Sequence, residues 1–221
     1  MRAVRALGGL LGELLVTVGA VLVLFVVWQL WWTDVVSDAD AQTVVTTLQQ
    51  EFTDPDWVQP EQVKLGDAFA IIRVPRFGAG FARPLYEGTT RDVLQRGVGH
   101  YASTARPGEV GNFAMAGHRT TYGKPFNQID RLVAGDVVLV ETKDTYYVYR
   151  VTEHQVVAPT QLSVLLPVPD EPDADASEAL LTMTSCHPEY SARERYVVHA
   201  KLDAEYPHSL GVPAEVLKVT G

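Results

Sequence analysis

The chain contains a single cysteine, Cys186, and its surroundings suit a nucleophile. One thiol forms neither an internal disulfide nor a thiolate metal cluster, so this residue is either an inert core residue or a reactive one. The apolar run 179–184 before it is typical of a strand, whereas His187-Pro188 must leave regular structure. We therefore predict that the thiol lies at a strand end. A second strand, starting at Arg195 nine residues on, would return a cation beside it.

Six histidines compete to be the base. His118 is the best candidate, because it follows the apolar strand 111–116 and because Gly117 allows close backbone approach. The weaker candidates are His100, His154, His187, His199 and His208. In such a site the thiolate attacks, a nearby imidazolium lowers the thiol pKa and protonates a departing amine, and the arginine stabilises an oxyanion. The three side chains together predict an enzyme that forms a thioester.

The composition suits one globular domain with extensions. The chain has 221 residues, of which 47% are hydrophobic and 20% charged. The net charge of -9 argues against a nucleic-acid partner, because no basic surface is available to neutralise phosphates. The acidic segment 167–178 matches no calcium-loop spacing, and we interpret it as a solvated, flexible loop. We expect neither a metal ion nor a cofactor.

The N-terminal region carries an apolar run, residues 14–32, that is long enough to span a membrane. We predict a signal-anchor helix over residues 10–32. Arg2 and Arg5 precede the run and acidic residues follow it, so residues 1–9 should be cytoplasmic and the rest of the chain extracellular. A cleaved signal peptide is the alternative. The length of the run, its terminal tryptophans and the lack of a small-residue cleavage site favour the anchor.

A short amphipathic helix should follow the anchor. Residues 38–52 carry apolar side chains at helical spacing, and Ser37 or Asp38 could cap the start of this helix. A proline-punctuated linker comes next. The regions expected after the anchor are residues 33–64 for juxtamembrane helix and linker, 65–204 for the catalytic domain and 205–221 for the C-terminal tail.

The sequence from Asp67 onward predicts short strands separated by turns. The predicted strands are residues 68–74, 84–87, 111–116, 136–141, 146–157, 179–185 and 195–202, with a helical turn at 90–95. About eight short strands indicate a mainly β fold, a small closed or mixed β-barrel in which closure hides the strand edges. Two strand ends in one barrel, those before His118 and at Cys186, can meet.

Three segments resemble the motifs of sortases, the cysteine transpeptidases that attach proteins to the Gram-positive cell wall. Thr182–Cys186 resembles the Thr-Leu-x-Thr-Cys strand end of the family, Ala116–Arg119 its histidine turn and Arg195–Val198 its arginine strand. Met183 and Ser185 depart from the pattern. They keep the apolar volume and the hydroxyl, respectively, so neither threatens the chemistry.

The resemblance implies an eight-stranded closed barrel with short helices, anchored in the cell membrane with its catalytic domain outside. It implies that Cys186, His118 and Arg195 are catalytic. The reaction would cleave an LAXTG- or LPXTG-type sorting signal between Thr and Gly and transfer the acyl group to an amine. The implied partners are surface proteins with such C-terminal signals and the amine of lipid II or of a peptidoglycan stem peptide.

Two further features resemble the class E branch of high-GC actinobacteria. They are the Cys-His-Pro sequence at 186–188 and the Gly-Val-Gly-His-Tyr sequence at 97–101. In that branch the tyrosine, here Tyr101, is associated with Ala rather than Pro in the second signal position, which makes it a substrate-pocket candidate. Simple barrel packing is the alternative for this side chain. The other substrate-binding candidates are Thr184, Ser185 and His187.

Other functions stay open at this point. A pilus-polymerising sortase is supported only by the Asp-Pro-Asp-Trp sequence at 54–57, a weak match to an active-site lid. An L,D-transpeptidase would favour Ser-x-Gly-Cys, which is absent around Cys186, and another thiol peptidase is a further enzymatic alternative. The non-enzymatic alternative is a membrane-anchored, wall-binding barrel with an inert cysteine.

Overall fold

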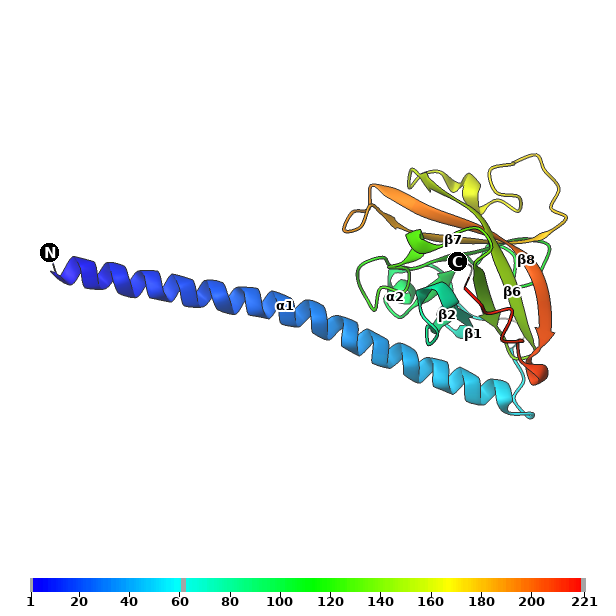
Figure 1. Cartoon of the computed structure of the whole chain (residues 1–221), viewed down its shortest axis with the longest axis horizontal. Coiled ribbons are helices and arrows are strands. Elements are labelled where there is room, and N and C mark those ends of the chain that lie inside the picture. The colour runs from blue at the N-terminus through cyan, green and yellow to red at the C-terminus, as the bar shows by residue number, and fades with distance from the viewer. Residues whose placement is uncertain (1, 61–62, 220–221) are drawn as a thin grey trace.

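The computed structural model describes residues 2–60 and 63–219. In this part of the chain a long helix, α1 (Arg2–Thr53), precedes a closed barrel (Figure 1). The strands are β1 (Ala68–Arg73), β2 (Arg83–Glu87), β3 (Val98–His100), β4 (Gly111–Ala116), β5 (Val137–Glu141), β6 (Thr145–Val157), β7 (Ala179–His187) and β8 (Glu194–Pro207). The short helices are η1 (Pro75–Phe77), α2 (Arg91–Leu94), η2 (Ile129–Arg131), η3 (Leu162–Leu165) and η4 (His208–Leu210).

The eight-stranded barrel predicted from the sequence is confirmed, with the strand order β1-β2-β3-β4-β7-β8-β6-β5. The strand that the prediction missed is β3, whose three residues are too few to show an alternating pattern and include a glycine. Strands β4 and β7 are neighbours and run parallel. Their carboxyl ends therefore lie at the same end of the barrel, although the strands are far apart in the sequence.

Alternation along β7 separates a core face from an outer face. Leu181 and Met183 are fully buried in the main core of the barrel. Because successive side chains of a strand point to opposite faces, Thr182, Thr184 and Cys186 share the outer face. The core thus fixes the orientation of the strand that carries the thiol.

Helix α1 runs without interruption from the apolar run onto the barrel. Ala41, Val45, Leu48 and Phe52 are each 3% exposed, and the last three pack against Ile71 of β1. These residues recur at helical spacing, so one stripe of the helix is buried. Burial of this stripe holds the barrel against the second half of α1.

The prediction of a separate juxtamembrane helix starting at Ser37 or Asp38 is wrong, because α1 already includes both residues. No glycine or proline between Gly19 and Pro55 interrupts the sequence, so nothing ends the first helix. The Asp38 carboxylate caps no helix start and instead accepts a hydrogen bond from Arg83 Nη2 at 2.6 Å.

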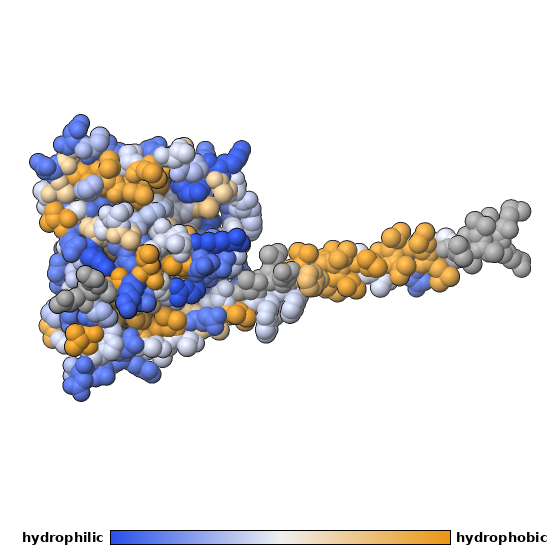
Figure 2. Space-filling view, turned by 180° about the vertical axis from the view of Figure 1, so that it is seen from behind, coloured by the Kyte–Doolittle hydropathy of each residue, from blue (hydrophilic) through white to orange (hydrophobic). Residues whose placement is uncertain are grey.

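The first half of α1 projects away from the barrel. Its segment Gly8–Trp28, 21 residues long, is apolar enough to cross a membrane, and none of it is buried in the structure. Figure 2 shows this segment as a hydrophobic band outside the globular part. It overlaps the membrane span predicted at residues 10–32.

Candidate active site

Cys186 and Arg195 lie directly opposite each other in the antiparallel pair β7–β8. Opposite residues of such a pair point to the same face of the sheet. That face is the outer one, because Tyr196 and Val198 of β8 are buried in the core. Both the thiol and the guanidinium are partly exposed there. The predicted hairpin therefore places a nucleophile and a cation on one surface.

The parallel pair β4–β7 brings His118 to the same rim. Beyond the end of β4, the Gly117 N–H donates to the Thr184 carbonyl at 3.1 Å. The Ser185 hydroxyl in turn donates to the Gly117 carbonyl at 2.8 Å. His118 thus follows β4 at the level where Cys186 follows Thr184 on β7. Residues that are distant in the sequence meet because two parallel strands end together.

Gly117 leaves no room for a side chain. A Cβ added at this position would lie 2.8 Å from Cδ2 of the Phe126 ring, closer than real contacts of this kind. The Phe126 N–H donates to the His118 carbonyl at 3.0 Å. The glycine therefore lets the His118 turn close onto a core aromatic ring.

The His118 imidazole is half-buried and packs against the Tyr122 ring, with ring centroids 5.1 Å apart. Its Nε2 atom is buried and has no hydrogen-bond partner among the described residues. Burial lowers the pKa of His118, because it disfavours the charged form. Burial thus favours the neutral form of the ring, and no described residue engages its Nε2 atom.

Burial of histidines predicts that the fold loses stability as the pH falls. Burial lowers the pKa values of His118 and His199 from 6.5. Below about pH 6.5 the unfolded chain binds protons that the folded chain does not. The free energy of unfolding should therefore decrease by up to about 1.4 kcal/mol per pH unit for each such histidine, until the folded-state pKa is passed.

Urea unfolding between about pH 7.5 and pH 5.5 measures this slope. His118→Asn should weaken the pH dependence, because one buried titrating group is removed. His154→Asn, at an exposed position of β6, is the matched control and should follow the wild type. An unchanged slope in His118→Asn would contradict the assignment.

Arg195 is oriented by the backbone of the β7–β8 turn. Its Nη1 donates to the carbonyls of Ala192 at 3.1 Å and of Glu194 at 2.9 Å. A guanidinium has five N–H donors, so these bonds leave others for a substrate carbonyl. Arg193, by contrast, is exposed and precedes β8.

Two of the four predicted substrate-binding residues lie together on the thiol side. Tyr101 Oη is 3.2 Å from Thr184 Oγ1, and the Thr184 hydroxyl donates to the Met115 carbonyl at 3.2 Å. Thr184 shares the outer face of β7 with Cys186. Tyr101 therefore lies beside Thr184, on the side of β7 that carries the thiol, and its contact with substrate stays a prediction.

The other two, Ser185 and His187, are on the opposite face of β7 from Cys186. The Ser185 hydroxyl is buried and bonded to the Gly117 carbonyl. His187 Nδ1 accepts a hydrogen bond from Arg119 Nη1 at 3.4 Å. Both side chains thus hold the His118 turn, and their direct contact with substrate stays a prediction.

Arg119 is a site residue to which the sequence analysis gave no role. It is only 4% exposed and forms an ion pair with Asp130 at 2.8 Å. Its Nε donates to the Asn127 carbonyl at 3.2 Å, and its guanidinium lies over the Tyr196 ring. Arg119 therefore fastens the turn that carries His118 to the barrel wall.

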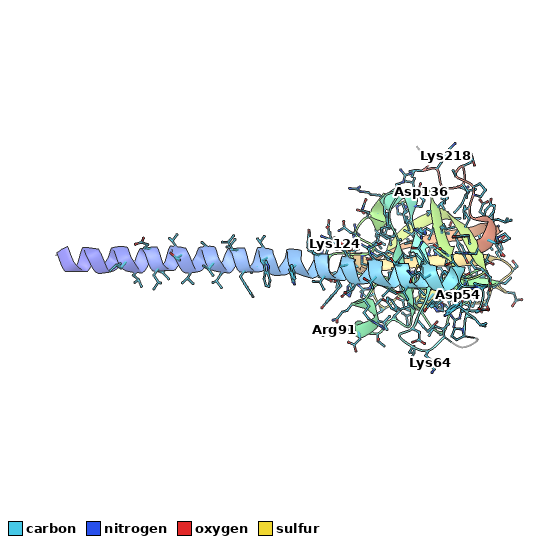
Figure 3. All side chains as sticks on the ribbon, turned by 90° about the horizontal axis from the view of Figure 1, so that it is seen from below. Asp54, Lys64, Arg91, Lys124, Asp136 and Lys218 are labelled. Atoms are coloured by element: carbon cyan, nitrogen blue, oxygen red, sulfur yellow. The ribbon has the colours of Figure 1, made fainter. Side chains whose placement is uncertain are left out.

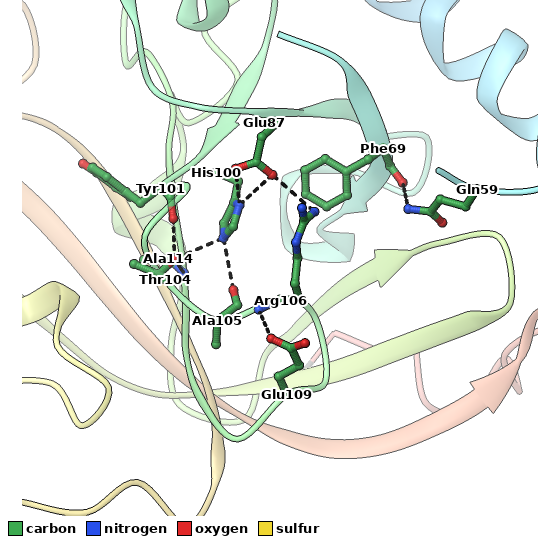
Figure 4. Close-up of polar contacts among 10 residues, drawn as sticks. All are labelled: Gln59, Phe69, Glu87, His100, Tyr101, Thr104, Ala105, Arg106, Glu109 and Ala114. Atoms are coloured by element: carbon green, nitrogen blue, oxygen red, sulfur yellow. Dashed lines mark hydrogen bonds and ion pairs between the residues drawn. The ribbon is translucent and has the colours of Figure 1, made fainter. Parts of the chain in front are cut away.

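A buried polar network supports the loop that carries Tyr101 (Figure 4). His100 is 1% exposed, and its Nδ1 lies 3.2 Å from both carboxylate oxygens of Glu87. Its Nε2 lies 3.0 Å from the Ala105 carbonyl, and Arg106 Nη1 pairs with Glu87 at 3.2 Å. Burial lowers the pKa of His100, and the Glu87 carboxylate opposes this shift. The network ties β2 and β3 to the loop before β4.

Glu87→Ala should lower the free energy of unfolding by about 3 kcal/mol or more, because it leaves His100 and Arg106 without their buried acceptor. Glu87→Gln keeps a polar side chain that can donate to Nδ1 of a neutral His100. It should cost about 1 kcal/mol. Urea unfolding at neutral pH compares the two variants. Equal losses would contradict a hydrogen-bonding role for this side chain.

The segment between β6 and β7 covers part of the outer face. Val164 packs on Val197 of β8, and Asp170 accepts hydrogen bonds from Gln155 Nε2 at 2.7 Å and Ser163 Oγ at 2.5 Å. The acidic segment interpreted as a solvated loop therefore begins in contact with the barrel. Within residues 2–60 and 63–219, no group of three or more His, Cys, Asp or Glu side chains is arranged to hold a metal ion.

Comparison with known proteins decides the family. The Sortase domain model matches residues 72–203. The chain belongs to the sortase family. Sortase SrtE1 of Streptomyces coelicolor is 38% identical over 215 residues, which are 92% of this chain but 59% of SrtE1. This chain thus spans about three fifths of the length of that relative.

Solved sortase structures support the same assignment. Sortase E from Streptomyces avermitilis is 40% identical with a TM-score of 0.64, over 70% of this chain and 99% of that one. Sortase E1 from Streptomyces coelicolor, solved with a tripeptide in the active site, is 36% identical with a TM-score of 0.63, over 69% and 98%. The predicted resemblance to class E sortases is confirmed.

Proposed function

We propose that this sortase is a membrane-anchored cysteine transpeptidase of class E type. It cleaves an LAXTG- or LPXTG-type sorting signal between Thr and Gly and transfers the acyl group to an amine of a cell-wall precursor. The observation that supports this most strongly is the register of β4, β7 and β8, which gathers His118, Cys186 and Arg195 at one rim. A thiol, a neutral imidazole and a fixed cation are the groups that acyl transfer through a thioester requires.

In the acylation step, His118 takes the thiol proton and the Cys186 sulfur attacks the threonine carbonyl carbon. The carbonyl oxygen becomes an oxyanion, which Arg195 stabilises. The C–N bond then breaks, and the His118 imidazolium gives its proton to the departing glycine amine. A thioester between the threonine carbonyl and Cys186 remains.

In the transfer step, the acceptor amine attacks the thioester carbonyl and loses a proton to His118. The C–S bond breaks and the thiolate recovers a proton, so the enzyme returns to its starting state. The tripeptide in the active site of the Streptomyces coelicolor sortase E1 supports a peptide substrate for this chain. Tyr101, beside Thr184 on the thiol side, is our candidate for reading the second signal position.

Hydroxamate formation tests the reaction. The full chain in detergent is incubated with LAXTG and LPXTG peptides and hydroxylamine, because residues 41–53 of α1 cover part of β1 and should not be removed. We expect a threonine hydroxamate, with the LAXTG peptide preferred. A scrambled peptide is the control. No hydroxamate, together with a native thiol that resists iodoacetamide, would favour the inert wall-binding alternative.

We also propose that α1 anchors the enzyme with the barrel outside. Arg2 and Arg5 precede the apolar segment Gly8–Trp28, whereas acidic residues follow it, and cationic flanks stay in the cytoplasm. Protease added to intact protoplasts should therefore remove the barrel. Degradation only after lysis would mean that the anchor is inverted.

A further inference from the structure

The turn that carries His118 is attached to the membrane-proximal part of α1. Lys124 Nζ lies 2.6 Å from Asp34 Oδ2. Gly123 approaches the helix so closely that an added Cβ would lie 3.1 Å from Asp38 Oδ1. Arg83 joins both partners, because its Nη2 donates to Asp38 at 2.6 Å and to the Gly123 carbonyl at 3.4 Å. A network of polar contacts therefore fixes this turn to the helix.

The same turn touches the candidate base. The Tyr122 ring packs on the His118 imidazole, and the next two residues make the contacts with α1. Tyr122, Gly123 and Lys124 all have positive φ, at 54°, 70° and 38°, so the chain reverses sharply between the imidazole and the helix. One tight turn thus connects the catalytic rim to α1.

The catalytic end of the barrel faces the direction in which α1 projects. In Figure 1 the turn between β7 and β8 lies on the left, the side toward which the helix extends. Figure 3 shows Lys124 at this end of the barrel and Asp54 near the other. The apolar packing of Val45, Leu48 and Phe52 on the barrel prevents the helix from swinging away.

Helix α1 also sets the distance between the membrane and the turn that carries His118. Asp34 and Asp38 follow Trp28, the last residue of the apolar segment, by six and ten residues. At 1.5 Å per residue, the His118 turn meets α1 about 9–15 Å beyond the apolar segment. The headgroup layer on each side of a bilayer is about 5–8 Å thick. The catalytic rim would therefore stand just above the headgroups.

We propose that α1 is a rigid spacer that holds the catalytic rim toward the membrane at this height, and that it thereby selects sorting peptides tethered close to the same bilayer. The inference rests on the proposed function. A height of about 9–15 Å corresponds to about 3–5 extended residues. The preferred substrate is thus a peptide whose Thr–Gly bond lies only a few residues from its own membrane segment.

An insertion in α1 tests the spacer. Seven helix-forming residues placed between Trp32 and Thr33 would raise the barrel by about 10 Å and change its rotation by only about 20°. The same seven residues inserted after Ala6, on the other side of the apolar segment, are the matched control. Both variants leave the contacts of Asp34 and Asp38 intact.

The full chain is placed in vesicles of phosphatidylcholine and phosphatidylglycerol with three substrates. They are a free sorting peptide and the same peptide joined to an apolar helix through 4 or 14 residues. We expect the Trp32 insertion to reduce cleavage of the 4-residue tether at least about 10-fold, since that tether spans at most about 14 Å. Cleavage of the free peptide and of the 14-residue tether should change less than about 2-fold. If the variant with the Trp32 insertion cleaved the 4-residue tether as fast as the wild type does, the proposal would be overturned.

A second measurement does not depend on catalysis. A fluorophore on Cys186, the only thiol, reports its distance from acceptors in the lipid headgroups by energy transfer. The Trp32 insertion should increase this distance by about 10 Å, and the control should not. An unchanged distance would overturn the spacer. Failure of the wild type to cleave even the free peptide would instead refute the proposed function, and the fluorescence result would still decide the spacer.

Discussion

The Cys186→Ala variant should lose acyl transfer by at least about 10⁴-fold and still fold, because the sulfur is the covalent partner of the substrate. The thiol lies on the outer face of β7, opposite the core side chains Leu181 and Met183. Removing it opens no cavity in the packed interior. The melting temperature should therefore stay close to that of the wild type.

Mass spectrometry checks the covalent role directly. The wild type, incubated with a sorting peptide without an acceptor amine, should carry an acyl adduct that Cys186→Ala lacks. Met183→Ala is the contrasting variant on the same strand. It truncates a fully buried side chain and should lower the free energy of unfolding by about 2–5 kcal/mol. Retained turnover in Cys186→Ala would refute the mechanism.

Arg195→Lys should reduce kcat/KM by about 100-fold or more, the scale of a lost transition-state contact. Arg195 is the register partner of Cys186, and its Nη1 is held by two turn carbonyls. Lysine keeps the positive charge but loses the planar fork that can bond the turn and a carbonyl together. The loss should appear mainly in kcat, because the oxyanion develops only in the transition state.

Arg193→Lys is the matched control and should be nearly silent. Arg193 is also close in sequence to the thiol, but it is exposed and lies outside β8. Steady-state kinetics of both variants with one sorting peptide make the comparison. If Arg193→Lys were the more impaired of the two, the arginine assignment would be wrong.

The sequence located most strands because they are β-tending runs of four or more residues, apolar or alternating, bounded by turn residues. Strand β3 was too short for this pattern, and α1 was divided because the sequence near Ser37 and Asp38 resembles a helix start. Only the contact of Asp38 with Arg83 shows that its carboxylate has a tertiary partner instead. Local patterns therefore indicate element types better than element boundaries.

The active site could be predicted from the sequence only in part, and for a different reason. The pairing of Cys186 with Arg195 follows from a local hairpin, which sequence spacing can predict. The meeting of the His118 turn with β7 depends on a parallel pair in which Ser185 and Gly117 are 68 residues apart. Periodicity carries no information about such a pairing. The burial of Arg119 depends on the same long-range contacts and left no signal in the sequence.

Strand periodicity alone predicts that the side chains of Ser185 and His187 point away from the thiol. Residues one position away from Cys186 on a strand point away from it, and this period-2 rule already separates them from the outer face. The sortase resemblance supplied the motif without the orientation of each side chain. In the structure, both residues contact the turn that carries His118 or its neighbour Arg119.

Closure of the barrel has a consequence for how a peptide is recognised. Every strand already has a hydrogen-bonded neighbour on both sides, including β7, which lies between β4 and β8. Residues 180–184 of β7 are paired with both β4 and β8, so a peptide bound over this stretch finds no free strand edge there. It cannot be held at that place by β-augmentation, in which backbone bonds accept almost any sequence. Over this stretch, affinity must come from side-chain contacts on the outer face. Enzymes that bind in this way discriminate by residue identity at each position, as the proposed recognition of a short sorting signal requires.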